Sequence, residues 1–467
     1  MAALALLPLL CGIALLWRAL SKPREASWRM GLALSLGPPL GLALSSLAYF
    51  LLRLVLGLSD SAYTAADTLF FLILLAVLLF TGMREEGRGF SFRLAASGGD
   101  ARPKHLLFVF GLALLLACLT TTAVTLLQPH GVRDAWSIWN LQARFFHMGG
   151  PDAWTEIFRI RSAQPDYPLM VPGSVARLWL FTGGPNLAAP ISVAMLFTAS
   201  TVALLCVATV ALKGRIIGLT AGAVLLAHPV FFQRGASQCA DIPLAFFILA
   251  TVVLFAMAEN AHRGAQGLIL ISGTVAAFAL WTKNEGLIFF PAAFMGRLYL
   301  SCATGSGARR WRDVGLFVLG SMAPLLAVLI HKGWYAPPNS YGPALVPSYI
   351  VSCFLDPSRY VTIVGALWDR LAHPNLIPGI IACFLPFVFG FSPQREQRRS
   401  GVVALGLVLT MGVAYFFIYV ITPDFFDLAW TVQVSASRLL LQIWPTLLFG
   451  VAMLVRTPER GLNQSSA

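Results

Sequence analysis

Apolar runs of about 20 residues recur from one end of the chain to the other, and they limit its fold more than any other feature. A helix of about 20 apolar residues crosses the ~30 Å of hydrocarbon in a bilayer. Only helices and closed barrels satisfy all their backbone polar groups in that environment. We therefore expect an all-α integral membrane protein with about 13 transmembrane helices, which begin near residues 2, 30, 66, 105, 187, 215, 241, 267, 286, 313, 375, 401 and 438.

The composition excludes an ordinary soluble protein. Hydrophobic residues make up 58% of the 467 residues and charged residues only 11%, whereas roughly 25% of a soluble domain is charged. The first apolar run has no basic residue before it and is followed by Arg18 and Lys22, which is the reverse of a cleavable signal peptide, so we expect it to remain a span. The second run contains Pro38 and Pro39 and is expected to be kinked or broken.

The basic residues indicate the orientation, because Lys and Arg concentrate in the cytoplasmic loops of membrane proteins. One alternate set of loops holds 21 of the 33 basic residues and 8 of the 20 acidic residues, so the whole net charge of +13 falls on that side. We therefore place these loops and the C-terminus in the cytoplasm, with the N-terminus outside.

The opposite side carries the long polar segments, residues 128–186 and 332–374, and shorter loops at 233–241 and 422–438. We expect the protein to act on the side where these long, aromatic, charge-balanced segments lie. We divide the chain into an N-terminal three-helix extension, residues 1–104, and a membrane core, residues 105–467.

The first outer segment opens with an acid and two tryptophans. Asp134 precedes Trp136 and Trp139, whose spacing predicts an interfacial helix with its aromatic face on the membrane. Asp134 is then either an ordinary N-cap or a functional acid. Prolines at 165, 168 and 172 surround Asp166 and Tyr167 and predict an extended, stiff path, which is either a structural turn or the wall of a substrate groove.

Further charged residues lie near the same side. Arg234 and Asp241 share a loop, and Asp241 is expected at a helix N-terminus, which does not exclude a role as a site acid. Lys283 and Glu285 interrupt two apolar runs in the motif WTKNEG. Charges at that depth are costly and tend to be functional, although a tight hairpin that reaches interfacial water is the structural alternative. Arg438 begins the last span and either extends to lipid head groups or clamps a phosphate.

Several common chemistries are missing from the sequence. We find no P-loop, dinucleotide glycine fingerprint, HExxH or GxSxG motif, and the seven histidines lack metal-ligand spacing, so we expect no dedicated metal site. The seven cysteines include no CxxC pair and are expected to be free thiols. A disulfide is conceivable only between Cys239 and Cys353, which lie outside the predicted spans.

Together these motifs resemble the bacterial membrane glycosyltransferases of superfamily C, which include protein O-mannosyltransferases and the aminoarabinose transferases of lipid A. The resemblance covers roughly residue 105 to the C-terminus. It depends on DAWSIWNLQAR from Asp134, YPLMVP from Tyr167, ADIPLAFF around Asp241, WTKNEG around Lys283, and the late Arg438. The family typically has two adjacent acids in the first outer loop. This chain does not, so a metal-bridging role is left without support.

The resemblance implies transfer of a hexose or pentose from a polyprenyl-phosphate carrier to an acceptor glycan, lipid or protein, with inversion, on the periplasmic side of a bacterial inner membrane. Its partners are then the lipid-linked donor, the acceptor and membrane lipid, without nucleic acid. No cofactor is certain, and the need for a divalent cation is open. Such a transfer requires a base beside the acceptor hydroxyl and positive charge beside the leaving phosphate.

The resemblance and this chemistry together suggest roles for ten residues. Asp134 is the candidate base, with Asp166 and Asp241 as orienting or substitute acids. The candidates for binding the donor phosphate are Lys283, Arg438 and Arg234, and the supporting residues are Glu285, Tyr167, Trp136 and Trp139. We also expect Trp136, Trp139 and Trp281 to offer outward faces to sugar or lipid.

Two other hypotheses compete with the transferase. A transporter or flippase of lipid-linked sugars would use the same acids as proton or substrate sites. The long outer segment argues against it, because transporters usually bind their substrate near the bilayer midplane. A structural membrane protein would use the polar motifs only as helix ends.

Overall fold

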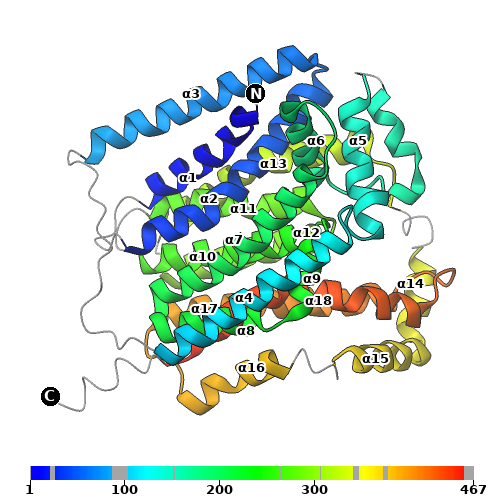
Figure 1. The fold of residues 1–467 in the computed structure, drawn as a ribbon. Helices are drawn as coiled ribbons and strands as arrows, with labels where there is room; N and C mark the ends of the chain where they lie inside the picture. Colours follow the sequence, from blue (N-terminus) through cyan, green and yellow to red (C-terminus); the bar gives the residue numbers. More distant parts are fainter. Residues whose placement is uncertain are drawn as a thin grey trace.

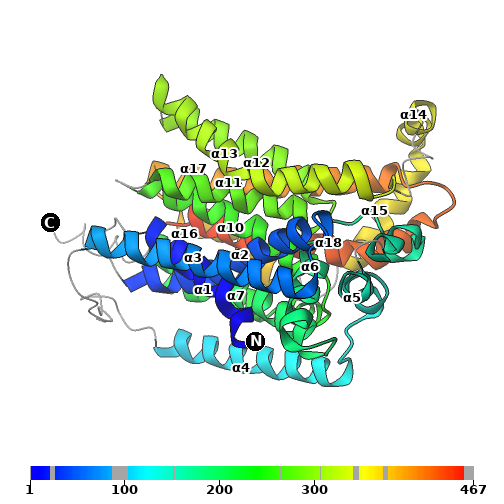
Figure 2. The ribbon, with the colours of Figure 1, turned by 90° about the horizontal axis from the view of Figure 1, so that it is seen from above.

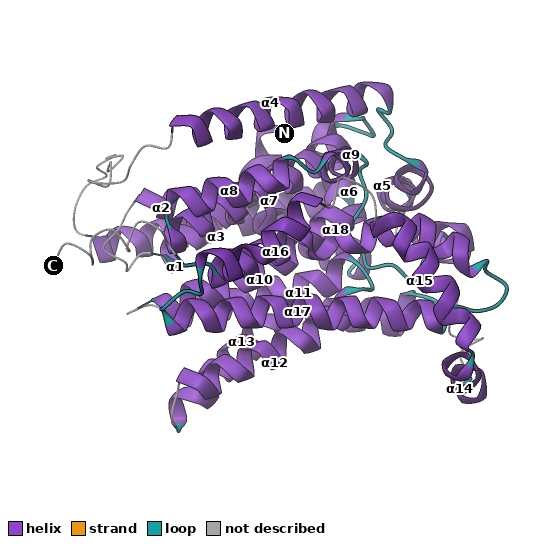
Figure 3. Cartoon of the chain, turned by 90° about the horizontal axis from the view of Figure 1, so that it is seen from below, coloured by secondary structure: helices purple, strands orange, loops and turns teal. Residues whose placement is uncertain are grey.

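The computed structural model describes residues 2–20, 27–86, 104–150, 153–261, 265–304, 307–339, 346–371 and 377–456. Every regular element within these residues is a helix, as the apolar runs predict (Figure 3). The elements that precede the first long connecting segment are η1 (Ala2–Leu6), α1 (Leu7–Ala19), α2 (Ser27–Ala48), η2 (Tyr49–Val55), α3 (Asp60–Glu86) and α4 (Lys104–Leu127).

Short helices fill the connecting segment, and longer ones build the rest of the chain. The short ones are η3 (Ala135–Trp139), α5 (Asn140–Met148), η4 (Ala153–Arg159), η5 (Arg161–Ala163) and α6 (Met170–Thr182). They are followed by α7 (Ala188–Lys213), α8 (Arg215–Leu226), α9 (Pro229–Ala236), α10 (Asp241–Asn260), α11 (Ala265–Thr282), α12 (Gly286–Thr304), α13 (Ala308–Ile330), η6 (His331–Tyr335), α14 (Pro347–Leu355), α15 (Pro357–Leu371), α16 (Ile377–Phe389), α17 (Arg395–Val420) and α18 (Leu428–Leu454).

Eleven helices in the described part of the chain are long and apolar enough to cross a membrane, or up to thirteen if two bent helix pairs each form one span. The pair α8–α9, bent by 66°, is the span expected from residue 215. The pair α14–α15, bent by 69°, lies inside the 332–374 segment, which we expected to be a loop. The span expected from residue 375 is α16, a helix of only 13 residues. The expected number of 13 spans therefore agrees only with the upper limit of the observed range. One span also differs, because α14–α15 takes the place of the expected span at α16.

The long helices run side by side, and the connecting helices gather at one end of the bundle (Figures 1 and 2). We name this end, which carries α5, α6, α14 and α15, the site end. The turn between α11 and α12 belongs to it, because Asn284 in that turn donates to Asp166 in the segment that carries α5 and α6. Polar side chains from distant parts of the sequence can therefore meet there.

Burial is uneven across the bundle. The most apolar 18-residue stretch of α10 is entirely buried, whereas that of α4 is only 11% buried. Figure 2 shows α4 along one edge of the molecule. Because α10 lies in the centre and begins with Asp241, the fold places a carboxylate in the middle of the site end.

A glycine seam, Gly12, Gly37 and Gly41, joins α1 to α2. A Cβ on Gly12 would lie 1.9 Å from the Gly37 carbonyl oxygen, and one on Gly41 would lie 1.8 Å from the Pro8 carbonyl oxygen. Small residues allow membrane helices to approach this closely.

α2 contains Pro38 and Pro39 but is continuous, so the expectation of a broken helix is wrong.

A buried ion pair joins the N-terminal helices to α6. The Arg177 Nη2 atom lies 2.6 Å from Asp67 Oδ2, and neither side chain is more than 1% exposed. Asp67 also accepts a hydrogen bond from the Tyr63 hydroxyl, and Arg177 donates to the Ala5 carbonyl. Segments before residue 104 are thus packed into the core, while the domain boundary at 104 stays a prediction.

Candidate functional site

Five ionisable residues from four distant segments meet at the site end. Asp134 precedes η3, and Asp241 is the first residue of α10. Lys283 and Glu285 lie between α11 and α12. Arg438 lies inside α18, which begins ten residues earlier at Leu428, so the expectation that Arg438 begins the last span is wrong. We name Asp134, Asp241, Lys283, Glu285 and Arg438 the charged cluster.

The turn from Lys283 to Gly286 is tight for a local reason. α11 ends at Thr282 and α12 begins at Gly286, so only three residues connect them. A Cβ on Gly286 would lie 2.2 Å from the Ala279 carbonyl oxygen, so only glycine fits. The chain therefore reverses while Lys283 and Glu285 are still beside the first turn of α10.

Arg438 and Lys283 share one carboxylate at the centre of the cluster. Arg438 Nη1 donates to Asp134 Oδ2 at 2.6 Å, and its Nε donates to Asp241 Oδ2 at 3.1 Å. Lys283 Nζ donates to Asp241 Oδ1 at 2.8 Å and to Glu285 Oε1 at 2.7 Å. Asp241 is thus the common partner of both cations.

Two neutral residues complete these contacts. Gln442, one turn after Arg438 in α18, donates to Asp241 Oδ1 at 2.9 Å. The Tyr415 hydroxyl of α17 donates to Gln442 Oε1 at 2.7 Å and fixes the orientation of the amide. The sequence analysis missed Gln442, although its spacing of four from Arg438 puts both side chains on one helix face.

Exposure divides the three carboxylates. The Asp241 side chain is 1% exposed and both its oxygens accept hydrogen bonds from cations, so it is suited to hold Lys283 and Arg438 in place. Glu285 is 15% exposed, and Asp134 is 32% exposed. Asp134 is therefore the carboxylate in the cluster that a molecule arriving from outside reaches most easily.

The cluster has more negative than positive charge. Its three carboxylates and two cations give a formal charge of −1, and each cation already contacts two carboxylates. The excess negative charge opposes the binding of an anion to these cations, and an anion binds more easily if one carboxylate gives up its contact.

The surroundings shift the pKa of Lys283 in the cluster and of two neighbouring groups, Tyr167 and Cys239. Burial opposes the charged form of Lys283, but the carboxylates of Asp241 and Glu285 outweigh it and raise the pKa of this amine above its usual value. Burial also raises the pKa of Tyr167, so its phenol stays neutral. Burial raises the pKa of Cys239 to about 12, which leaves an unreactive thiol. Cys239 and Cys353 are both free cysteines.

Asp166 lies in a second polar group on the other side of the same turn. Its Oδ2 atom accepts hydrogen bonds from Asn284 Nδ2 at 2.7 Å and from Asn339 Nδ2 at 3.0 Å. Lys332 Nζ donates to the Asp166 carbonyl oxygen and to Asn284 Oδ1. Asp166 is thus not in direct contact with the charged cluster. Asn284 stands next to Lys283 in sequence and connects the two groups.

A pocket of about 370 Å³ lies beside this second group. Lys332, Asn284 and Asn339 supply polar groups, while Leu287, Pro337 and Pro338 are among its apolar residues. The sequence analysis missed Lys332 and Asn339. Neither residue lies in a motif, and only the fold brings them to Asp166.

The N-terminal helices support the turn from behind. The Trp281 indole nitrogen donates to the Ser46 hydroxyl at 3.3 Å, and its ring packs against Phe50 with centroids 5.0 Å apart. Trp281 and Trp139 are both fully buried, so the expectation that they face outward is wrong. Trp139 instead stacks on Tyr167, with centroids 5.3 Å apart. Trp136 is 55% exposed, as expected.

The helix predicted around Trp136 exists but has a different orientation. It begins as the π-helical η3 and continues as α5, and its buried face carries Ile138, Trp139, Ala143 and Phe146 against the rest of the protein. The aromatic face therefore packs on protein, and the π-helical turn places Trp136 off that face.

Several structural alternatives can now be decided. Asp134 makes no N-cap hydrogen bond, because its carboxylate contacts Arg438. Arg438 pairs with Asp134 and Asp241, so its side chain does more than extend to lipid head groups. Lys283 is buried, so its amine does not reach interfacial water. Pro172 lies in the first turn of α6, where the missing N–H is harmless, so the stiff path ends before this proline.

Arg234 is the predicted site residue that the cluster does not include. It lies in the last turn of α9, and within the described residues its side chain has no hydrogen bond or ion pair. Also within that part of the chain, no group of three or more His, Cys, Asp or Glu side chains could hold a metal ion.

The comparisons with known proteins found no match. No family model matches the sequence, and neither a curated protein nor a solved structure is similar to it.

Proposed function

We propose that the protein is a membrane glycosyltransferase that moves a sugar from a polyprenyl-phosphate donor to an acceptor at the site end, and that this end faces the periplasm of a bacterial inner membrane. The observation that supports this most is the meeting of Asp134 with Arg438 and Lys283, through Asp241, from positions up to 304 residues apart. The resemblance to superfamily C suggests the same residues.

The proposed reaction uses the difference in exposure within the cluster. Asp134 takes the proton of the acceptor hydroxyl, whose oxygen forms the new bond to the anomeric carbon. The bond from that carbon to the carrier phosphate breaks, and the phosphate oxygen keeps the electron pair. Arg438 and Lys283 stabilise the negative charge that develops there.

The excess carboxylate suggests how binding prepares this reaction. The donor phosphate competes with Asp134 for the Arg438 guanidinium, which prefers a bidentate anion. When Arg438 turns to the phosphate, Asp134 loses its partner and becomes free to accept a proton. Lys332, beside the adjoining pocket, is a further candidate cation for the phosphate.

A transporter is supported less well. Asp134, Asp241 and the turn after α11 lie at helix ends at the site end, and Arg438 reaches them from ten residues inside α18. Transport sites lie near the bilayer midplane, usually at discontinuous helices that both halves of the protein share.

Transfer in proteoliposomes tests the proposal. The full-length chain is supplied with polyprenyl-phosphate sugars and with membrane extracts as acceptor, and sugar release from the carrier is followed by mass spectrometry. Asp134→Asn should lower the rate by about 10²–10⁴-fold, the usual contribution of a general base. Glu156→Gln is the matched control, because Glu156 is an acid at the same end that pairs only with Arg159.

Of two informative results, the first rejects the enzyme and the second rejects only its proposed base. One is unaltered lipid-linked sugar that crosses the bilayer without transfer, which would support the flippase. The other is a normal transfer rate in Asp134→Asn with a correctly inserted protein, which would remove Asp134 from the reaction.

A further inference from the structure

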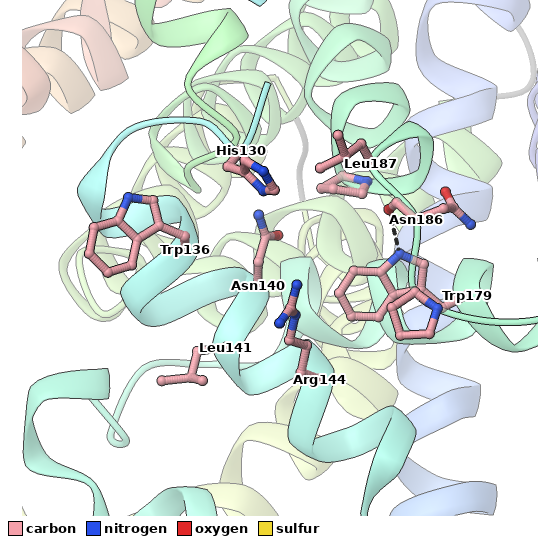
Figure 4. Close-up of a pocket in the computed structure, with 10 residues that line it drawn as sticks. His130, Trp136, Asn140, Leu141, Arg144, Trp179, Asn186 and Leu187 are labelled. Carbon is pink, nitrogen blue, oxygen red and sulfur yellow. Dashed lines mark hydrogen bonds between the residues drawn. The ribbon is translucent and has the colours of Figure 1, made fainter. Parts of the chain in front are cut away.

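A pocket of about 330 Å³ lies beside η3, near the charged cluster but outside it. We name it the indole pocket, and it is lined by His130, Trp136, Asn140, Leu141, Arg144, Trp179, Pro185, Asn186, Leu187 and Pro190. Figure 4 shows Trp136 and Trp179 on opposite sides, with Asn140, Arg144 and His130 between them. We infer that this pocket binds a saccharide that carries a carboxylate, as part of the acceptor.

The shape of the pocket is fixed on one side and open on the other. The Trp179 indole nitrogen donates to the Asn186 carbonyl oxygen at 2.8 Å, and Asn186 Oδ1 in turn accepts from the backbone of Ala189 at 3.0 Å. Trp136, in contrast, is 55% exposed. A preformed wall that faces an exposed indole suits a pyranose ring, which has an apolar C–H face and polar edges, because indoles offer a large apolar surface.

One polar atom in the wall lacks a partner. Asn140 Nδ2 donates to Gln238 Oε1 at 3.0 Å, which fixes the amide, but Asn140 Oδ1 is buried and has no hydrogen-bond partner among the described residues. This oxygen is closed to solvent, so a ligand in the pocket does not reach it. Asn140 contributes to the pocket through the fixed position of its amide.

The charge of the pocket selects an anion. Arg144 is exposed and lines the pocket together with His130, and the described lining contains no acidic residue. A guanidinium binds a carboxylate through two parallel hydrogen bonds. The ligand that satisfies both the indoles and the guanidinium is a uronate-type saccharide.

The pocket lies beside Asp134, the proposed base. The role of the pocket as the acceptor site therefore depends on the proposed function. Asn140 holds Gln238, and Gln238 donates to the Pro129 carbonyl oxygen, so the segment that carries Asp134 is attached to the chain just before Asp241. Gly131, with φ of +74°, lies at this attachment, and a Cβ there would be 2.6 Å from the Ser237 carbonyl oxygen. An acceptor in the pocket would thus lie against the same short helix that Asp134 precedes.

Binding can be measured without any transfer reaction. The full-length chain in lipid nanodiscs is titrated with methyl glucuronide and with methyl glucoside, which share a ring and differ by the carboxylate. Ligand-observed saturation-transfer NMR is suited to weak binding. We expect the glucuronide to bind about two- to fivefold tighter, because the Arg144 guanidinium is exposed and its attraction for a carboxylate is reduced by solvent screening.

Variants assign this difference to the pocket. Arg144→Gln should remove the preference for the glucuronide, and Trp136→Ala should weaken the binding of both sugars. Arg133→Gln, at an exposed arginine of the same segment that does not line the pocket, should change neither. Arg144 and Trp136 are exposed, so these substitutions should leave the fold intact.

Three results overturn the inference: equal binding of the two sugars, binding that Arg144→Gln leaves unchanged, or displacement of the glucuronide by short-chain phosphatidylglycerol that itself binds through Arg144. The last result would identify a lipid head-group site. Failure of the proposed function looks different, because glucuronide would still bind through Arg144 while no sugar is transferred. Asp134→Asn should abolish transfer and leave this binding unchanged.

Discussion

The pair Arg177–Asp67 and the charged cluster use the same kinds of side chain in opposite ways. In the pair, one arginine and one aspartate are sealed from solvent, the charges cancel, and Tyr63 and Ala5 supply further hydrogen bonds. In the cluster, the two cations share three carboxylates and exposure rises from Asp241 to Asp134. A charge-balanced, sealed pair holds helices together, whereas a cluster with one carboxylate in excess and one open edge can exchange a partner.

The largest expected effect is on the sealed pair. Arg177→Met leaves the Asp67 carboxylate buried without a cation and should lower the free energy of unfolding by about 3–5 kcal/mol. SDS titration of the purified protein in mixed micelles measures this loss. Adding Asp67→Leu should restore much of it, because a buried pair can be replaced by apolar residues at little cost. A single variant as stable as the wild type would contradict the structural role.

A smaller loss is expected at the centre of the cluster. Asp241→Asn keeps the shape of the side chain but removes the charge that Lys283 and Arg438 share, while Glu285 and Asp134 still contact these cations. We expect a loss of about 1–3 kcal/mol in the same titration, together with loss of transfer. If Asp241→Asn kept full transfer, Asp241 would not be needed to position the two cations.

The smallest expected effect on stability is at the open edge. Asp134→Asn should change the free energy of unfolding by less than about 1 kcal/mol, because partly exposed pairs contribute little. The exposed pair Arg159–Glu156 gives the reference, and Glu156→Gln should change stability by no more than about 0.5 kcal/mol. The comparison is sharpest if Asp134→Asn abolishes transfer while its unfolding resembles that of Glu156→Gln. A loss as large as that of Arg177→Met would make Asp134 a structural residue.

Much of the fold follows from hydrophobic length alone. Eleven of the expected spans coincide with long apolar helices, because a run of about 20 apolar residues has few other ways to satisfy its backbone in a bilayer. The errors fall where length is ambiguous. α16 is short, and α14–α15 is apolar but bent, so neither pattern distinguishes a span from a surface helix.

The candidate site was partly predictable because charge in an apolar sequence is rare. Asp241, Lys283 and Arg438 stand out for this reason, and the fold brings them into contact. Tyr415 and Asn339 are neutral and gave no such signal, and Lys332 lies in no motif, so none of the three was predicted. The sequence also did not predict which way a side chain points, since Trp136 is exposed and Trp139 is buried although both have the same local pattern.

The glycine seam limits which substitutions this sequence can accept. At Gly12, Gly37 and Gly41 even alanine would collide with the backbone of the neighbouring helix. α2 then continues to Ser46 and η2 to Phe50, which touch Trp281 beside the turn of Lys283. Saturation mutagenesis should therefore find these three lipid-depth positions as intolerant of change as the site itself, while the outward positions of α4 accept almost any apolar residue.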